Sequence, residues 1–474
     1  MSVYDPKSMK AEEFINHEEI LDTLTYAQEN RHNAELIDAI LEKAKKRKGL
    51  SHREASVLLA CDLEEKNQEI YALAEQIKKD FYGNRIVMFA PLYLSNYCVN
   101  GCVYCPYHAK NKHIPRKKLT QDEVRREVIA LQDMGHKRLA IEAGEDPVNN
   151  PIEYILECIN TIYSIKHKNG AIRRVNVNIA ATTVENYRKL RDAGIGTYIL
   201  FQETYHKESY EKLHPTGPKH NYCYHTEAMD RAMQGGIDDV GIGVLFGLEL
   251  YRYEFAGLLM HAEHLEAAFG VGPHTISVPR IRQADDIDPS TFDNGIDDDI
   301  FAKIVACIRV AVPYTGMIIS TRESKKCRER VLHLGVSQIS GGSRTSVGGY
   351  VEPEPEEESS AQFDVEDKRT LDEVVRWLME LGYIPSFCTA CYREGRTGDR
   401  FMSLCKSGQI QNCCHPNALM TLKEYLEDYA SPETYRIGQA LIQQEVHNVP
   451  KEKVREIVLE NLKNIEAGSR DFRF

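Results

Sequence analysis

Short apolar runs alternate with longer amphipathic stretches over most of the chain. We count eight such runs, at 85–93, 137–145, 173–183, 196–204, 238–247, 273–280, 315–322 and 335–342. The stretches between them carry apolar residues at helical spacing, and several end in glycine, which is favoured at helix C-termini. Eight strand–helix units over about 260 residues predict a TIM-type (β/α)8 barrel, with functional residues at the C-terminal ends of its strands.

The two ends of the chain depart from this pattern. Residues 1–80 are rich in Glu, Lys, Ala and Leu at helical spacing, which predicts a helical N-terminal extension before a barrel at 81–350. The stretch EPEPEEESS, at 352–360, holds two prolines and five glutamates and predicts a solvated linker. Residues 351–474 would then form a C-terminal domain that carries a second group of cysteines and ends in helices.

Composition and charge narrow the class of protein. The chain is 42% hydrophobic and 27% charged, which is ordinary for a folded protein. Lys and Arg number 59 against 71 Asp and Glu, so the net charge of -12 argues against nucleic acid or an anionic membrane as a partner. Neither a signal peptide nor an apolar run of membrane-spanning length is present, so we expect a cytoplasmic protein.

The first cysteine group directly follows the first predicted strand. Cys98, Cys102 and Cys105 have the spacing C-x3-C-x2-C, so a tight loop can place three thiolates on three corners of a four-iron cluster. Gly101 would allow backbone angles that a side chain resists. The fourth iron stays open and can bind S-adenosylmethionine and cleave it reductively to a 5′-deoxyadenosyl radical. The alternative is a zinc site with His108 as a further ligand.

At these residues the chain resembles the radical S-adenosylmethionine (SAM) superfamily. Tyr104 stands where that family has an aromatic residue near the adenine. The segment AGEDP, with Ala143, Gly144 and Glu145, resembles the Gly-Gly-Glu motif that holds the methionine amino group, although alanine replaces the commoner first glycine. Weaker candidates for contacts to the same cofactor are Asn178, Ala180 and Glu203.

The second cysteine group lies beyond the barrel. Cys388, Cys391 and Cys414 have the spacing C-x2-C-x22-C and could hold a second cluster. A zinc site is equally open on spacing alone, because tetrahedral zinc accepts cysteine and histidine ligands. The residues that could complete such a site are Cys405, Cys413 and His415.

The combination of motifs resembles one family over nearly the whole chain. Both cysteine groups together with AGEDPVNNP, NVNIAATTVENY, FQETYH, GPHTISVPR and CTACYREGRTGDRFM resemble the tyrosine lyase maturases of [FeFe] hydrogenases, the HydG family. The resemblance implies an auxiliary [4Fe-4S] cluster on Cys388, Cys391 and Cys414, joined through a bridging sulfide and free cysteine to a fifth iron. Cys413 is adjacent to Cys414 and could replace it.

The resemblance also implies a histidine on the fifth iron. His274 is our choice because it opens the sixth strand at the bottom of the barrel, whereas Arg280 closes that strand near the radical site. Six residues at about 3.3 Å each separate these ends by about 20 Å, which suits two clusters at opposite mouths. His261 and His264, on the preceding helix, are the competing candidates.

The reaction implied by the resemblance is radical cleavage of the Cα–Cβ bond of L-tyrosine to p-cresol and dehydroglycine. Dehydroglycine would then become carbon monoxide and cyanide on the fifth iron, for assembly of the hydrogenase H-cluster. The implied partners are a reductant protein and other hydrogenase maturation proteins. A substrate carboxylate inside a dry barrel calls for arginine. We expect this role for Arg322, assisted by Ser343, with Arg280 as a further candidate.

Two other functions stay open. The 2-iminoacetate synthase of thiamine thiazole biosynthesis shares the barrel, the first cluster and tyrosine cleavage but lacks the C-terminal cluster. A non-catalytic iron–sulfur or zinc-stabilised carrier would use the same cysteines without radical chemistry.

Overall fold

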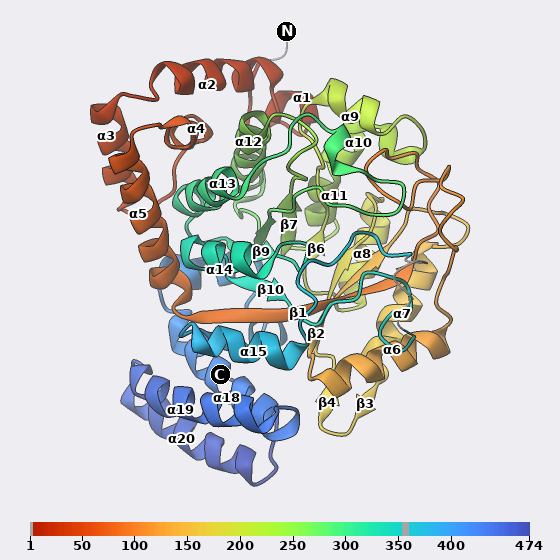
Figure 1. Cartoon of the computed structure of the whole chain (residues 1–474), viewed down its shortest axis with the longest axis vertical. Coiled ribbons are helices and arrows are strands. Elements are labelled where there is room, and N and C mark those ends of the chain that lie inside the picture. Colours follow the sequence, from red (N-terminus) through yellow and green to blue (C-terminus); the bar gives the residue numbers. More distant parts are fainter. Residues whose placement is uncertain (1–2, 353–359) are drawn as a thin grey trace.

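A computed structural model describes residues 3–352 and 360–474 (Figure 1). Most of the predicted linker, 353–359, therefore lies outside the described residues. All thirteen cysteines of the chain lie within the described part, and none forms a disulfide. Within that part, every helix is too short or too polar to cross a membrane.

The centre of the molecule is a closed barrel of parallel strands. In barrel order the strands are β1 (Arg85–Ser95), β2 (Arg138–Ala143), β5 (Arg174–Asn178), β6 (Tyr198–Ile199), β7 (Val240–Gly243), β8 (Thr275–Ser277), β9 (Gly316–Ile319) and β10 (Gln338–Ser340). Pairing of β10 with β1 closes the sheet. The eight strands fall in the eight predicted apolar runs, and the predicted (β/α)8 barrel is confirmed.

Helices surround this barrel, as Figure 1 shows. They are α6 (Gln121–Met134), α7 (Ile152–Ser164), α8 (Val184–Asp192), α9 (Lys207–Leu213), α10 (Tyr222–Thr226), α11 (Ala228–Gln234), α12 (Tyr251–Phe269), α13 (Asp298–Ala311) and α14 (Lys325–Leu334). α6 shows how local sequence sets its bounds: Thr120 and Glu123 form a capping box at its start, and Gly135 ends it with φ 103°. A short hairpin, β3 (Lys166–His167) and β4 (Gly170–Ala171), interrupts the alternation and was not expected.

The N-terminal region covers one side of the barrel. It consists of α1 (Ala11–Phe14), α2 (His17–Glu29), α3 (Ala34–Ala44), α4 (His52–Ala60) and α5 (Glu64–Tyr82). α4 packs on α12 and α13, and α5 packs on α13 and α14. These helices thicken the barrel wall on one side, and α5 ends at the start of β1, where Tyr82 lines the base of the barrel (Figure 1).

The C-terminal region attaches at the N-terminal ends of the strands. Its elements are α15 (Leu371–Glu380), β11 (Ile384–Ser386), α16 (Ala390–Arg393), α17 (Gly398–Lys406), α18 (Gln411–Asp428), α19 (Pro432–Glu445) and α20 (Glu452–Glu466). β11 pairs in parallel with the first residues of β1, with Ile384 opposite Arg85. The sequence did not predict this ninth strand, because three residues centred on Pro385 carry no strand periodicity; proline is tolerated at such an edge.

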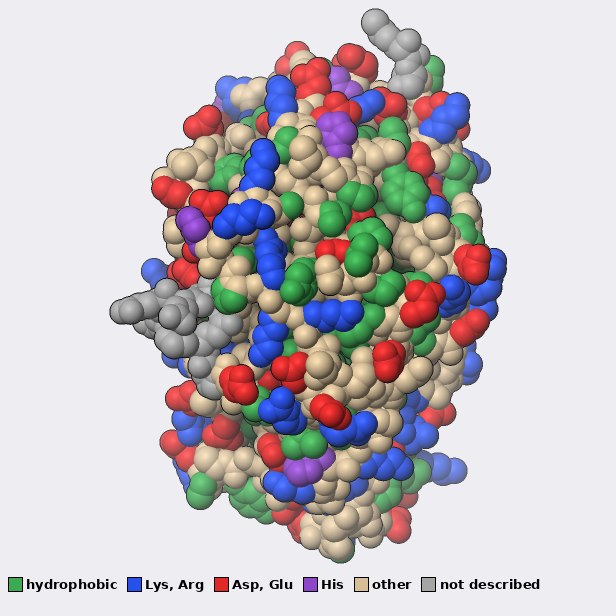
Figure 2. Space-filling view, turned by 90° about the vertical axis from the view of Figure 1, so that its right-hand side faces the viewer, with side chains coloured by type: hydrophobic (Ala, Val, Ile, Leu, Met, Phe, Trp, Pro, Cys, Tyr) green, Lys and Arg blue, Asp and Glu red, His purple; other side chains and the backbone are tan. Residues whose placement is uncertain are grey.

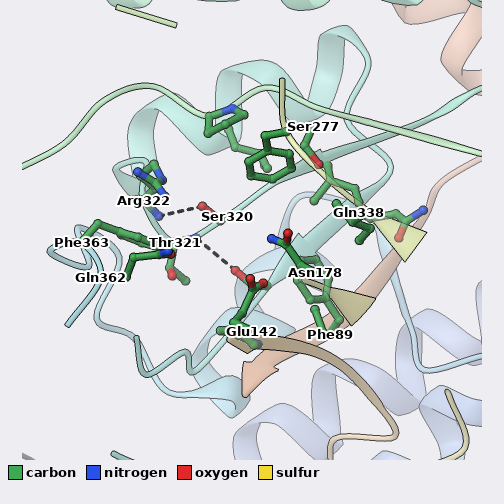
Figure 3. Close-up of a pocket in the computed structure, with 18 of the residues that line it drawn as sticks. Phe89, Glu142, Asn178, Ser277, Ser320, Thr321, Arg322, Gln338, Gln362 and Phe363 are labelled. Carbon is green, nitrogen blue, oxygen red and sulfur yellow. Dashed lines mark hydrogen bonds between the residues drawn. The ribbon is translucent and has the colours of Figure 1, made fainter. Parts of the chain in front are cut away.

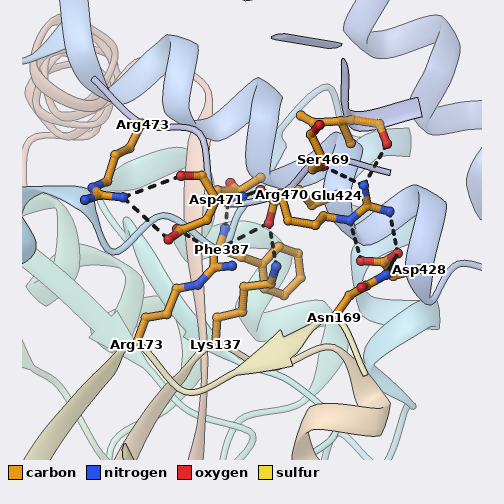
Figure 4. Close-up of polar contacts among 12 residues, drawn as sticks. Lys137, Asn169, Arg173, Phe387, Glu424, Asp428, Ser469, Arg470, Asp471 and Arg473 are labelled. Carbon is orange, nitrogen blue, oxygen red and sulfur yellow. Dashed lines mark hydrogen bonds and ion pairs between the residues drawn. The ribbon is translucent and has the colours of Figure 1, made fainter. Parts of the chain in front are cut away.

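The last residues of the chain return to the base of the barrel (Figure 4). Glu424 of α18 is fully buried and binds Lys137 Nζ at 2.6 Å and Arg173 Nη1 at 3.5 Å. Asp471 binds Arg393 of α16 through both carboxylate oxygens, each at 2.6 Å. This network ties the tail and α18 to the barrel, and it fixes α16, which carries Cys391.

This network yields a stability prediction. Glu424→Gln removes a buried carboxylate and leaves the buried ammonium of Lys137 without its partner, whereas Arg173 keeps Asp471 at 3.2 Å, so we expect a loss of about 3–5 kcal/mol. Denaturant unfolding measures it. Asp133→Asn is the matched control, because Asp133 pairs with an exposed Lys168 and should cost less than about 1 kcal/mol. Equal losses in the two variants would contradict the assignment.

Candidate functional site

Three adjoining cavities run through the barrel from one end of the strands to the other. A mouth cavity of about 150 Å³ lies at the C-terminal ends of the strands, a barrel cavity of about 90 Å³ lies inside, and a base cavity of about 70 Å³ lies at their start. The mouth and barrel cavities share Tyr93, Glu142, Asn178, Phe201, Arg322 and Gln362. The barrel and base cavities share Gln338.

The loop after β1 brings the first three cysteines to the mouth cavity. Cys98, Cys102 and Cys105 all line it. Gly101 does not have the left-handed backbone that we expected. Glycine is needed here because Thr216 lies very close to it. A Cβ at position 101 would collide with Oγ1 of Thr216, and the carbonyl of Thr216 accepts a hydrogen bond from Gly101 N at 3.0 Å.

The surroundings of these thiols suit a metal cluster. Burial raises the pKa of Cys102 to about 12 and raises the pKa of Cys105 as well, so only a bound cation would hold them as thiolates. Across residues 3–352 and 360–474, no three His, Cys, Asp or Glu side chains converge closely enough to hold a single metal ion. In a four-iron cluster each cysteine binds a different iron, so its thiols surround the cluster and do not converge on one point.

Every residue that we expected to contact S-adenosylmethionine lines the same cavity. These residues are Tyr104, Ala143, Gly144, Glu145, Asn178, Ala180 and Glu203. Gly144 leaves no room for a side chain, because a Cβ would collide with the carbonyl oxygen of Tyr97. Burial raises the pKa of Glu145, whose carboxylate accepts a hydrogen bond from Asn100 Nδ2 at 2.6 Å. This hydrogen bond joins the AGEDP segment at the end of β2, the strand-two motif, to the cysteine loop.

Lys219 belongs to this cavity, and sequence reasoning missed it. Its Nζ lies 2.8 Å from Oε1 of Glu203. Glu203 itself has φ 69°, a backbone conformation that non-glycine residues rarely adopt and that concentrates at functional sites. Lys219 lies in a short 3-10 turn between helices, away from any strand end, so no sequence pattern points to it.

Arg322 faces the barrel cavity with an uncommitted guanidinium (Figure 3). It lies over the ring of Phe363 at 3.8 Å, and in the described part of the chain no carboxylate pairs with it. Across the cavity, burial raises the pKa of Glu142 well above its usual range, against the opposing effects of Arg322 and Asn178. A neutral carboxylic acid of this kind can donate a hydrogen bond. Glu142 was missed, although its position at an inward-facing end of β2 was a usable signal.

The other two expected substrate contacts lie outside the cavity linings. Arg280 binds Asp298 at 2.7 Å and also pairs with Glu323, so its charge is already neutralised. Ser343 is buried three residues beyond β10, and its hydroxyl has no hydrogen-bond partner among the described residues. The structure thus brings Arg322 into the cavity without these two.

The second cysteine group meets His274 at the base cavity. Cys388, Cys391 and Cys414 all line it, together with His274. A hydrogen bond with Cys414, with further help from Arg396, lowers the pKa of Cys391 to about 5. Three thiols and an imidazole around one cavity are a donor set that iron accepts.

The competing ligands lie elsewhere. Cys405 and Cys413 do not line the base cavity, and His415 binds the carbonyl of Glu445 at 3.0 Å. His264 binds Asp230 at 2.9 Å, and His261 binds the hydroxyl of Tyr205 at 3.0 Å. Neither of these two histidines lines the cavity.

Three arginines also line the base cavity, and sequence reasoning did not single them out. Arg85, Arg138 and Arg174 each stand at the first residue of a strand and are almost fully buried. Arg138 donates a hydrogen bond to the carbonyl of Cys388 at 2.8 Å. Positive charge here favours thiolate ligands, whose negative charge would otherwise be costly to bury.

This chain is similar to known families and to solved structures. The family model of the Radical SAM superfamily matches residues 92–258, and that of the Biotin and Thiamin Synthesis associated domain matches 277–384. A crystal structure of HydG, described as a maturase of the [FeFe]-hydrogenase, is 57% identical with a TM-score of 0.94 and covers 97% of this chain and 100% of its own. HydG from Carboxydothermus hydrogenoformans is 40% identical with a TM-score of 0.83, over 95% of this chain and 99% of its own.

A curated relative outside HydG is more distant. The 2-iminoacetate synthase of Salmonella typhimurium is 28% identical over 349 residues, which cover 73% of this chain and 89% of that protein. The match to the first HydG structure, by contrast, extends over 97% of this chain. This chain is therefore a radical SAM enzyme and belongs to the HydG family.

Proposed function

We propose that this enzyme is a tyrosine lyase that supplies carbon monoxide and cyanide, bound to iron, for the H-cluster of an [FeFe] hydrogenase. It would cleave the Cα–Cβ bond of L-tyrosine to p-cresol and dehydroglycine. The maturase named in the 57% identical structure supports the biological role. Its partners would be a reductant protein, free cysteine and other maturation proteins, and it would act in the cytoplasm.

One observation carries the proposal: cysteine triplets line the two ends of one barrel, and the barrel cavity between them shares lining residues with the cavity at each end. A reaction in two stages needs this arrangement, because the fragment made at the mouth has to reach the base. Dehydroglycine is readily hydrolysed, so a closed barrel protects it on the way.

The residues at the mouth would prepare the substrate. When bound, a [4Fe-4S] cluster on Cys98, Cys102 and Cys105 with S-adenosylmethionine supplies a 5′-deoxyadenosyl radical. Arg322 would hold the tyrosine carboxylate bidentately, since its guanidinium has no carboxylate partner in the described chain. Glu142, held neutral by burial, would donate a hydrogen bond to a polar group of the substrate.

The residues at the base would hold the second group. Cys388, Cys391 and Cys414 would bind the auxiliary cluster, and His274 would bind the fifth iron. When present, this group provides the iron on which carbon monoxide and cyanide are collected. Nδ1 of His274 lies 3.3 Å from Oδ1 of Asp239 without a hydrogen bond between them, and a carboxylate at this position would orient the imidazole once its other nitrogen binds iron.

The runner-up is a 2-iminoacetate synthase, which would release dehydroglycine. The similarity to that enzyme over 73% of the chain favours it. The base cavity argues against it, because three cysteines and a histidine gathered there have no use if the product simply leaves. Formation of carbon monoxide and cyanide beside p-cresol separates the two functions. A non-catalytic carrier would form no 5′-deoxyadenosine.

Replacing Cys98, Cys102 and Cys105 with alanine should abolish both 5′-deoxyadenosine and p-cresol, because no radical forms without the first cluster. Anaerobic turnover with product chromatography measures both. Surviving p-cresol would refute the assignment of the mouth cavity.

Arg322→Gln should lower kcat/KM for tyrosine about 10- to 100-fold, which corresponds to about 1.5–3 kcal/mol for a hydrogen bond to a charged group. Arg282→Gln is the matched control, because Arg282 pairs with Glu323 and is absent from the cavity linings. Equal effects in the two variants would show that Arg322 does not bind the substrate.

Cys388→Ser combined with Cys391→Ser should separate the two ends of the barrel. This variant should still form p-cresol and 5′-deoxyadenosine but should deliver no iron-bound carbon monoxide or cyanide, which infrared spectroscopy detects. His274→Ala should have a milder effect, since the cysteines remain. Complete loss of p-cresol in a folded double variant, or full maturation activity, would each contradict the division of labour.

A further inference from the structure

Three exposed valines lie on segments that adjoin the first cysteine group. Val99 and Val103 belong to the cysteine loop itself and are 38% and 45% exposed, and Val148 follows the strand-two motif and is 85% exposed. The two segments are joined, because Val99 N donates a hydrogen bond to the carbonyl of Glu145 at 2.8 Å. The outer side of the cysteine loop is therefore apolar, immediately outside the thiols of the mouth cavity.

A basic segment borders these valines. Residues 110–118 hold five cations and no acid, in a chain whose net charge is -12. The cations are Lys110, Lys112, Arg116, Lys117 and Lys118. Contacts fix the segment to the cysteine loop: Ala109 N donates to the carbonyl of Asn100 at 2.8 Å, and Arg116 Nη1 donates to the carbonyl of Tyr107 at 2.8 Å. Figure 2 shows a face of the molecule on which Lys and Arg side chains lie beside exposed hydrophobic ones, with Asp and Glu side chains among them.

Part of this charge is already engaged within the chain. Arg116 donates to four backbone carbonyls, and Lys118 lies over the ring of Tyr154 at 4.1 Å. Lys117 is 4.0 Å from Glu123 and from Glu352. Lys110 and Lys112 are exposed, and within the described chain neither pairs with a carboxylate.

We propose that this surface, the three valines with residues 110–118, docks a small acidic one-electron carrier protein. The inference rests on the proposed function, because the group held by Cys98, Cys102 and Cys105 needs one electron for each cleavage. The carrier is oxidised by one electron and that group is reduced by one. A small apolar centre with a basic rim suits a weak, transient complex in which charge sets the encounter rate. The electron then crosses only the cysteine loop.

The test compares a protein donor with a small reductant. Lys110→Glu combined with Lys112→Glu should weaken binding of a low-potential flavodoxin at least about tenfold, measured by calorimetry on the holoenzyme at low salt. Added salt should weaken binding of the unmodified enzyme far more than that of the variant, because the screened charges are gone. Flavodoxin-driven formation of 5′-deoxyadenosine should fall by a similar factor, whereas the dithionite-driven rate should be unchanged.

Two further variants sharpen the result. Lys46→Glu combined with Lys48→Glu makes the same charge change after α3, far from the mouth, and should leave flavodoxin binding unaltered. Val148→Asp should weaken binding through the apolar centre. Unchanged binding in the Lys110 and Lys112 variant, or an equal loss in the Lys46 and Lys48 control, overturns the proposal, as does a parallel loss of the dithionite-driven rate. If the unmodified enzyme formed no 5′-deoxyadenosine with dithionite, the proposed function would fail while calorimetry still reported on docking.

Discussion

The pairing of β1 with three other strands determines where both cysteine groups lie. Its middle residues pair with β10 and its later residues with β2, which closes the barrel. Its first residues pair with β11, which leads directly into Cys388, while its end leads into Cys98. From Val87, opposite Ser386, to Ser95 there are eight residues, or about 26 Å at about 3.3 Å each. One continuous strand thus sets the spacing between the two candidate cluster sites.

The inward-facing residues of the strands give the base, the middle and the top of the barrel interior different chemical character. β2 places Arg138 at the base, Ala140 in the middle and Glu142 at the top. β5 repeats the order with arginine at the base and asparagine above it. A small or uncharged middle layer leaves space that most barrels fill with branched apolar side chains. The barrel cavity therefore lies between an arginine-rich base and a mouth lined by the first cysteine group.

Sequence patterns predicted the features that depend only on neighbouring residues in the chain. The eight strands follow from apolar runs, and the C-x3-C-x2-C loop follows from its own spacing. His274 could be placed because it opens a strand whose end was already assigned. β11 and Lys219 could not be predicted, because their positions depend on pairing and packing with distant segments. Arg280 shows the opposite failure: it lies three residues beyond the end of β8 instead of closing the strand, and Glu323 and Asp298 neutralise its charge. Such partners are visible only in three dimensions.

The central claim is that one barrel holds two different iron–sulfur clusters. Anaerobic iron and sulfide analysis of the reconstituted protein, combined with electron paramagnetic resonance after reduction, tests it most directly. We expect two distinct cluster signals, of which only one changes when S-adenosylmethionine is added, because that cofactor is proposed to bind at the mouth cavity alone. A single cluster signal, with iron and sulfide sufficient for one cluster only, would contradict the account.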